Sequence, residues 1–179
     1  LDTADRLQNE ENLRFILAGA GAERSALMAE ARNRRLDNVI FVPPQPKDNM
    51  PAVWSLCDVA LVHLRNNAAF REVIPSKIFE AMAMGLPIIL ATPEGEASRI
   101  VAEDGAGIWG PAEDPDALAQ AVRRLMYDSE TRRTLAAQSL AAAPEHTREN
   151  QARKMLAVLE LAAAGRGSEV GVLVPTRAP

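Results

Sequence analysis

The chain has 179 residues, of which 47% are apolar and 25% charged, and its formal net charge at pH 7 is −4. This balance suits one globular domain with its own core, and the slight negative charge argues against binding to nucleic acid through a basic surface. The only cysteine, Cys57, excludes an internal disulfide and is typical of a reducing compartment. Without a run of about 18 apolar residues, we expect no transmembrane helix, and we expect no secretory signal.

Short apolar runs alternate with helical patterns along most of the chain. The runs that predict strands cover residues 13–18, 38–42, 58–64, 86–91 and 105–110. Helical patterns cover residues 22–35, 48–56, 75–84, 96–101, 115–127, 129–140 and 145–163, and Asp48 and Ser129 are the expected N-caps of two of these helices. This alternation predicts an α/β protein with a Rossmann-like, doubly wound parallel sheet. We expect one domain over residues 1–164 and a disordered tail over residues 165–179, which are rich in glycine, alanine and proline.

Residues 72–87 are interpreted as a loop that runs into a helix. Pro75 suits the first helical position, where its missing N–H costs nothing. Gly85 predicts the end of the helix, because glycine is common just past a helix C-terminus and Pro87 cannot continue the helix. Glu72 would then lie in the loop and Glu80 about one turn inside the helix.

The first turn of this helix carries residues suited to an anion and a sugar. Free N–H groups near Pro75, Ser76 and Lys77 would have no intrahelical acceptor and lie at the positive end of the helix dipole. Ser76 adds a hydroxyl and Lys77 a positive charge, and Glu80 lies one turn further on the same face. A phosphate at the helix tip and a ribose beside Glu80 would fit this arrangement, so the residues predict a nucleotide site.

Other candidates follow the first and third predicted strands. Gly19 and Gly21 stand between a strand and a helix, which is the layout of a nucleotide-binding turn, although glycines here can also be simple turn residues. His63 ends the third strand and either faces a ligand or is a partly buried structural residue, the reading we favour. Arg65 and Arg71 give the next loop a positive charge, which serves either phosphate or sugar contact or only solvation.

The two glutamates carry a family resemblance. Glu72 and Glu80 have seven residues between them, and Glu80 is followed by Ala-Met-Ala-Met-Gly-Leu-Pro. This pattern resembles the glutamate-pair signature of retaining GT-B glycosyltransferases of family 4. The run Pro-Ser-Lys-Ile-Phe-Glu-Ala-Met-Ala-Met-Gly is similar to the branch that builds O-antigen and capsular polysaccharide from UDP-sugars. The resemblance covers roughly residues 13–160, as the C-terminal, donor-binding half of a GT-B fold.

The resemblance implies a role for most of the candidate residues. Glu80 would accept hydrogen bonds from the ribose, and Glu72 would bind a hydroxyl of the donor sugar. Lys77 and Ser76, with the helix tip, would hold the diphosphate and stabilise the charge that grows on it as the sugar leaves. Glu72 and Lys77 are therefore the expected catalytic residues. The remaining donor-binding residues are expected to be Gly19, Gly21, Pro44, Gln45, Arg71, Ile74 and Pro75.

Two loops depart from the family pattern. The loop Pro43–Pro46 would read the nucleobase with its backbone, but the family usually has glycine at position 43, and a plain proline-stiffened connection is the alternative. Many relatives also carry Gly-Gly-x-Pro-Glu near residues 92–96, where this chain has Thr-Pro-Glu-Gly-Glu. A role of this segment in shaping the donor-sugar pocket cannot be assigned to one residue from the sequence.

The implied reaction is transfer of a sugar from a UDP-sugar donor to a glycan or lipid-linked acceptor, with retention of anomeric configuration. The one Asp-x-Asp run, Asp114-Pro115-Asp116, is interpreted as part of an acidic helix cap and not as a metal motif, so we expect a metal-independent enzyme with no cofactor besides its donor substrate. The acceptor would sit on an N-terminal GT-B domain that this sequence lacks, together with an upstream strand that bears other phosphate-binding residues, so the chain alone would be inactive. The family context implies a cytoplasmic protein, peripheral at the inner membrane face through that domain, in polysaccharide or lipopolysaccharide synthesis for the cell envelope.

Other functions remain open. A UDP-sugar 2-epimerase-like enzyme would isomerise the sugar without an acceptor, and GDP instead of UDP would change the substrate class. A non-catalytic doubly wound nucleotide-binding or signalling module is a further alternative, but a receiver-type module would have an acidic cluster where Gly19-Ala20-Gly21 stands. A glycosidase is disfavoured because it sets two carboxyl groups facing each other across one bond, whereas Glu72 precedes the helix that carries Glu80.

Overall fold

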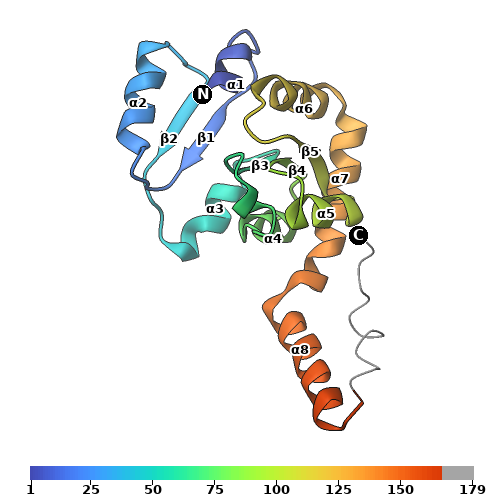
Figure 1. The fold of residues 1–179 in the computed structure, drawn as a ribbon. Coiled ribbons are helices and arrows are strands. Elements are labelled where there is room, and N and C mark those ends of the chain that lie inside the picture. The colour runs from blue at the N-terminus through green and yellow to red at the C-terminus, as the bar shows by residue number, and fades with distance from the viewer. Residues whose placement is uncertain (167–179) are drawn as a thin grey trace.

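Five short parallel strands and eight helices make up the described part of the computed structural model, residues 1–166 (Figure 1). Most of the tail expected to be disordered, residues 167–179, lies outside the described residues. The strands are β1 (Phe15–Ala18), β2 (Val39–Val42), β3 (Ala60–His63), β4 (Ile88–Ala91) and β5 (Gly107–Gly110). The helices are α1 (Asp2–Arg6), α2 (Arg24–Asn33), α3 (Met50–Trp54), α4 (Lys77–Ala83), α5 (Glu96–Glu103), α6 (Pro115–Tyr127), α7 (Ser129–Ala142) and α8 (Arg148–Ala163), with 3-10 turns η1 (Lys47–Asn49), η2 (Ala68–Phe70) and η3 (Ala143–His146).

The strands form two hydrogen-bonded groups. β1 pairs with β2, with Phe15 opposite Val39, and β4 lies between β3 and β5. Each connection between consecutive strands contains a helix, as parallel pairing requires. Phe15 of the first group and Leu61 of the second pack against the same buried cluster, which includes Leu7 and Leu125. Side-chain packing therefore joins the two groups where sheet hydrogen bonds do not.

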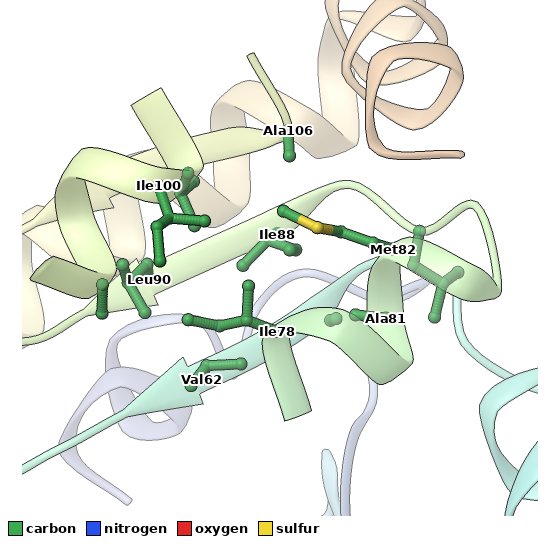
Figure 2. Packing of buried hydrophobic residues seen from close by; sticks show 12 residues of the cluster. Val62, Ile78, Ala81, Met82, Ile88, Leu90, Ile100 and Ala106 are labelled. Carbon is green, nitrogen blue, oxygen red and sulfur yellow. The ribbon is translucent and has the colours of Figure 1, made fainter. Parts of the chain in front are cut away.

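The helix α4 is held in the core by its apolar face. Ile78, Ala81 and Met82 are each 0% exposed and pack with strand residues such as Val62 and Leu90 (Figure 2). Their i, i+3, i+4 spacing puts them on one stripe of the helix, and burial of a side chain as large as isoleucine or methionine stabilises the fold by about 1.5–3 kcal/mol. The opposite face is thereby turned outward, and it carries the exposed residues Lys77 and Glu80.

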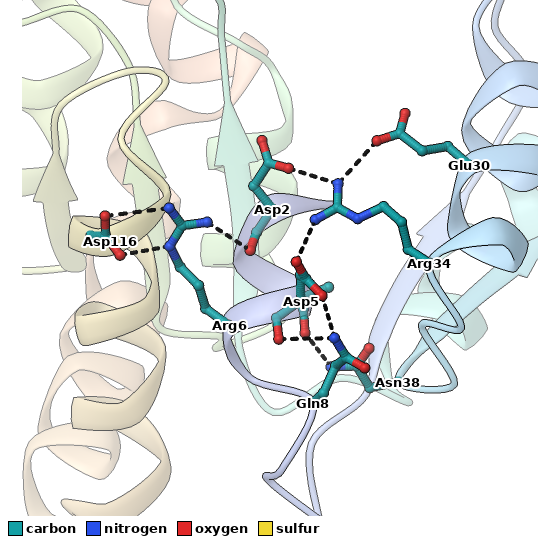
Figure 3. Close-up of polar contacts among 9 residues, drawn as sticks. Asp2, Asp5, Arg6, Gln8, Glu30, Arg34, Asn38 and Asp116 are labelled. Atoms are coloured by element: carbon teal, nitrogen blue, oxygen red, sulfur yellow. Dashed lines mark hydrogen bonds and ion pairs between the residues drawn. The ribbon is translucent and has the colours of Figure 1, made fainter.

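Charged side chains fix α1 between its neighbours (Figure 3). Arg34, the residue just past the end of α2, donates to Asp2 and Asp5 at 2.7 and 2.8 Å, and Arg6 reaches Asp116 of α6 at 2.6 Å. Hydrogen bonding to Arg34 lowers the pKa of Asp2 below its ordinary value. Because these side chains are partly exposed, each ion pair contributes little to stability alone. Together they connect α1 to the end of α2 and to α6.

Three local details differ from the sequence prediction. α4 starts at Lys77, with Ser76 as N-cap, so Pro75 precedes the helix and is not its first residue. The N-cap of α7 is Asp128, whose carboxylate accepts the Thr131 N–H at 2.8 Å, and not Ser129. Asp48 makes no side-chain cap, because it lies inside the turn η1 before α3. The predicted end of α4 is confirmed, since Gly85 has φ +64° just past the C-cap.

The C-terminal helix α8 extends away from the rest of the chain (Figure 1) and has no buried residue. At its base, the His146 ring stacks on Phe79 of α4, with 4.8 Å between centroids, and its Nε2 lies 2.6 Å from Asp104 Oδ2. Among the helices of the described residues, none is both long and apolar enough to cross a membrane.

Candidate functional site

The candidate residues follow the carboxyl ends of β1, β2 and β3. Gly19 and Gly21 follow β1, Pro44 and Gln45 follow β2, and His63 ends β3. In a parallel sheet, strand carboxyl ends share one edge, and this edge is where ligands of doubly wound proteins bind. The predicted glycine turn and proline loop therefore lie at the same edge of the β1–β2 pair, and His63 lies at the carboxyl end of β3 in the second group. Both are strand ends of the kind where doubly wound proteins bind ligands.

The start of α4 brings two of the predicted residues into contact. Ser76 Oγ donates a hydrogen bond of 3.4 Å to Glu80 Oε1, across the first turn of the helix. Both side chains are exposed, and so is that of Lys77. Ser76 and Glu80 thus meet on one exposed face of the helix start, and the exposed Lys77 directly follows Ser76 in the chain. The long Ser76–Glu80 bond lies near the limit for a hydrogen bond and leaves the carboxylate free to take stronger donors.

The loop that carries Glu72 is fixed on both sides. At its start, Asn67 Oδ1 accepts the Ala69 N–H at 3.0 Å and so caps η2. Further on, the Arg71 carbonyl accepts the Glu96 N–H at 2.8 Å, which ties the loop to the start of α5. Glu72 directly follows this bond, and its side chain is exposed. The position of its backbone is therefore set by the start of α5 as well as by the turn η2.

The loops after β1 and β2 offer backbone groups. A Cβ built on Gly19 or Gly21 would meet no atom within 4 Å, and Gly19 has φ +132°, a conformation that other residues rarely adopt. In the next loop, the Gln45 amide donates to the Pro43 carbonyl at 3.1 Å and accepts from Asn49 at 2.8 Å. Because the Gln45 side chain is engaged inside its own loop, a ligand there would meet mainly backbone.

Positive charge near β3 acts on His63. His63 is exposed at the strand end, yet its pKa is lowered from its ordinary 6.5, first by desolvation and then by nearby positive charge that includes Lys77. The neutral form is thus favoured in the folded chain. Since the unfolded chain binds the proton at higher pH, His63 lowers the free energy of unfolding as pH falls below 6.5 and has no such effect above it.

Two further residues near this edge were not singled out from the sequence. Thr92 follows β4 and is fully buried, and its hydroxyl has no hydrogen-bond partner among the described residues. Gly95 lies against the Arg71 backbone, where a Cβ would come within 2.1 Å of the carbonyl oxygen. No sequence pattern marks the contact between Gly95 and Arg71, because these residues meet only through the fold.

The described residues also form a hollow away from the predicted site. A shallow hollow of about 530 Å³ lies between α2 and β2, where Met28 and Phe41 line it, and it includes none of the predicted site residues. No group of three or more His, Cys, Asp or Glu side chains within residues 1–166 is arranged to hold a metal ion.

Comparison with known proteins identifies the family. Residues 1–140 match the family described as glycosyl transferases group 1. The chain belongs to this family. It is 31% identical over 121 residues to a D-inositol 3-phosphate glycosyltransferase from Salinispora tropica, a match that covers 66% of this chain and 24% of the relative. The chain therefore spans about a quarter of that relative's length.

Solved structures confirm the fold. Sucrose-phosphate synthase from Thermosynechococcus elongatus superposes with a TM-score of 0.74 at 24% identity, over 92% of this chain and 42% of that one. HepE from Anabaena, solved in complex with UDP, gives a TM-score of 0.68 at 20% identity over 89% of this chain and 44% of that one. The predicted α/β, Rossmann-like architecture of the GT-B glycosyltransferases is therefore confirmed.

The influence of Lys77 on His63 can be measured. In the folded chain, we expect an NMR titration of the His63 imidazole to give a midpoint below 6.5. Lys77→Gln should raise this midpoint without moving it past 6.5, because desolvation, the larger cause, remains. A His146→Asn variant assigns the two histidine signals.

Lys154→Gln serves as the control, since Lys154 lies on α8 and pairs with Glu145, and it should leave the His63 midpoint unchanged. A wild-type midpoint at or above 6.5, or one that does not respond to Lys77→Gln, would contradict this description of the site.

Proposed function

We propose that this chain is the donor-binding part of a retaining, metal-independent glycosyltransferase of GT-B family 4, and that its donor is a UDP-sugar. The observation that carries the proposal is the exposed Ser76–Glu80 face of α4, at the ligand edge of a chain that belongs to the group 1 glycosyltransferases. The UDP and UDP-glucose complexes of HepE, a protein of the same fold, support a nucleotide sugar as the ligand.

In this proposal, Glu80 binds the ribose. Its carboxylate faces outward from a helix whose other face is fully buried, so its position is well defined. Two ribose hydroxyls could donate to it and displace the 3.4 Å bond from Ser76, because hydrogen bonds to an ionised carboxylate are the stronger ones. Ser76 would then be free to donate to the diphosphate.

Lys77 and the backbone of the first turn of α4 hold the diphosphate. As the sugar leaves, negative charge grows on the diphosphate, and a fixed cation at that point stabilises the transition state. Arg71 adds a second positive charge nearby in sequence, and Ile74 and Pro75 line the approach to the helix. We propose that these groups do the work that a metal ion does in other glycosyltransferases.

The remaining contacts follow from the loops. Glu72 binds a hydroxyl of the donor sugar, the backbone of Pro44 and Gln45 reads the nucleobase, and the open turn at Gly19 and Gly21 lies against the donor. The retaining mechanism and the O-antigen and capsular branch rest on the resemblance carried by the glutamate pair.

The acceptor belongs to another part of the protein. Because the chain spans about a quarter of its relative's length, we propose that an N-terminal GT-B domain supplies the acceptor site and that this chain alone is inactive. A glycan or lipid-linked acceptor at the cytoplasmic membrane face, in polysaccharide or lipopolysaccharide synthesis, completes the proposal. WaaG, a solved protein of the same fold, is described as involved in lipopolysaccharide biosynthesis.

The first test is nucleotide binding. We expect calorimetry to show that the chain binds UDP more tightly than GDP. Glu80→Ala should weaken UDP binding by at least about tenfold, because each hydrogen bond to a charged group contributes on the order of 1.5–3 kcal/mol.

Glu160→Ala is the matched control, because Glu160 is an exposed glutamate on α8, and it should leave UDP affinity unchanged. Tighter binding of GDP would change the substrate class. If the full-length gene product binds neither nucleotide, or if Glu80→Ala and Glu160→Ala behave alike, the proposed donor site is wrong.

The second test is the reaction of the full-length gene product. NMR of the glycoside formed early in the reaction should show the anomeric configuration of the donor, and EDTA should leave the rate unchanged. An inverted product or a rate that needs added divalent metal would contradict the proposed mechanism. Isomerisation of a UDP-sugar without acceptor would favour the epimerase-like alternative, and UDP binding without any turnover would favour a non-catalytic module.

A further inference from the structure

Gly95 stands where α5 begins, and the backbone of Arg71 occupies the space that a side chain would need. A Cβ built on Gly95 would lie 2.1 Å from the Arg71 carbonyl oxygen and 2.8 Å from its carbonyl carbon. Gly95 has φ 171°, an extended conformation that any residue can adopt. The requirement for glycine here is therefore one of space and not of backbone angle.

Hydrogen bonds and burial fix the start of α5 where the Arg71 backbone contacts it. Ser98 Oγ accepts the Gly95 N–H at 2.9 Å and donates to the Gly95 carbonyl at 2.8 Å. Ser98 and its neighbour Ala97 are both buried. The next N–H, that of Glu96, donates to the Arg71 carbonyl at 2.8 Å. The Arg71 carbonyl is thus seated directly on a capped and buried helix start.

The seated carbonyl belongs to the peptide that joins Arg71 to Glu72. Around it, the loop has little freedom: Asn67 caps η2 on one side, and the Val73 N–H returns to the Phe70 carbonyl at 3.3 Å on the other. A movement of the Arg71 carbonyl must therefore move the backbone of Glu72. Glu80 is different, because α4 is fixed by its own buried face.

We propose that Gly95 is a positioning residue for donor-sugar recognition: its missing side chain lets the Arg71–Glu72 peptide seat on α5, and this seat sets where Glu72 meets the sugar. The inference rests on the proposed role of Glu72. In it, Gly95 acts through the loop and touches no ligand.

The size of the effect follows from the contact. Real Cβ atoms do not approach other atoms closer than about 3.0 Å, so Gly95→Ala must push the peptide away by roughly 1 Å. Misplacement of a reacting or binding group by this amount can lower a rate on the order of a hundredfold. The ribose contact of Glu80 should be spared, so the loss should fall on the sugar and not on the nucleotide.

The experiment compares two ligands in the full-length gene product. Calorimetry is run with UDP and with whichever of UDP-glucose, UDP-galactose and UDP-N-acetylglucosamine binds the wild type most tightly. For Gly95→Ala, we expect UDP affinity within twofold of wild type, a fall of about tenfold in the affinity for the UDP-sugar, and a fall in kcat of ten- to a hundredfold.

A double variant tests whether Gly95 acts through Glu72. In a Glu72→Gln background, Gly95→Ala should cause no further loss of UDP-sugar affinity, because effects that share one group are not additive. Additive losses would show that Gly95 acts by another route and would overturn the proposal.

Two glycines of β5 provide matched controls. A Cβ on Gly107 would lie 2.0 Å from the Ile88 carbonyl oxygen, as tight as at Gly95 but away from the loop, whereas at Gly110 the nearest atom is 3.9 Å away. Gly107→Ala should lower the midpoint of urea unfolding without changing the ratio of UDP-sugar to UDP affinity. Gly110→Ala should resemble wild type in both respects.

Ser98→Ala keeps the proposal testable if Gly95→Ala does not fold. It removes the side-chain hydrogen bonds at the start of α5 without adding atoms. UDP-sugar affinity should fall more than UDP affinity, by a smaller factor than in Gly95→Ala. The proposal is overturned if Gly95→Ala keeps wild-type UDP-sugar affinity, if it weakens both ligands equally, or if it fails to fold and Ser98→Ala has no selective effect. Failure of the wild type to bind UDP would instead reject the proposed function itself.

Discussion

The burial of one face of α4 is the constraint on which the site depends. Ile78 and Met82 are fully buried against β3, β4 and α5, and the helix cannot rotate without exposing them. This packing forces Lys77 and Glu80 outward, one turn apart at the edge where strand carboxyl ends lie. The chemistry of the site therefore follows from hydrophobic packing on the far side of the same helix.

Glu72 and Glu80 belong to one candidate site, but different elements hold them in place. Glu72 lies on a loop whose carbonyl at Arg71 is bonded to the start of α5, while Glu80 lies on α4. In the proposed function, these two glutamates with different supports hold different parts of one donor, the sugar and the ribose, and can be perturbed separately. Membership of the group 1 glycosyltransferases is the reason for relating these two contacts to a glycosyl donor.

Local sequence patterns predicted most of the fold, but they did not predict contacts between residues that are far apart in the chain. The five strands were found because each is a short apolar run, and the end of α4 because Gly85 takes the positive φ that glycine allows. The first turn of α4 was placed two residues too early, because Pro75 is as compatible with a loop as with a helix start. The seat of Arg71 on Gly95 could not be predicted, since nothing local marks a contact between residues 24 positions apart.

The central claim is that a UDP-sugar binds across the strand ends and the start of α4. The most direct test is to add UDP to the ¹⁵N-labelled chain and to follow each backbone amide by NMR. The account predicts shifts at Gly19, Gly21, Gln45 and residues 76–80, with the amides of α8 unmoved. Shifts confined to the hollow between α2 and β2, or saturable binding that leaves the start of α4 unchanged, would contradict it.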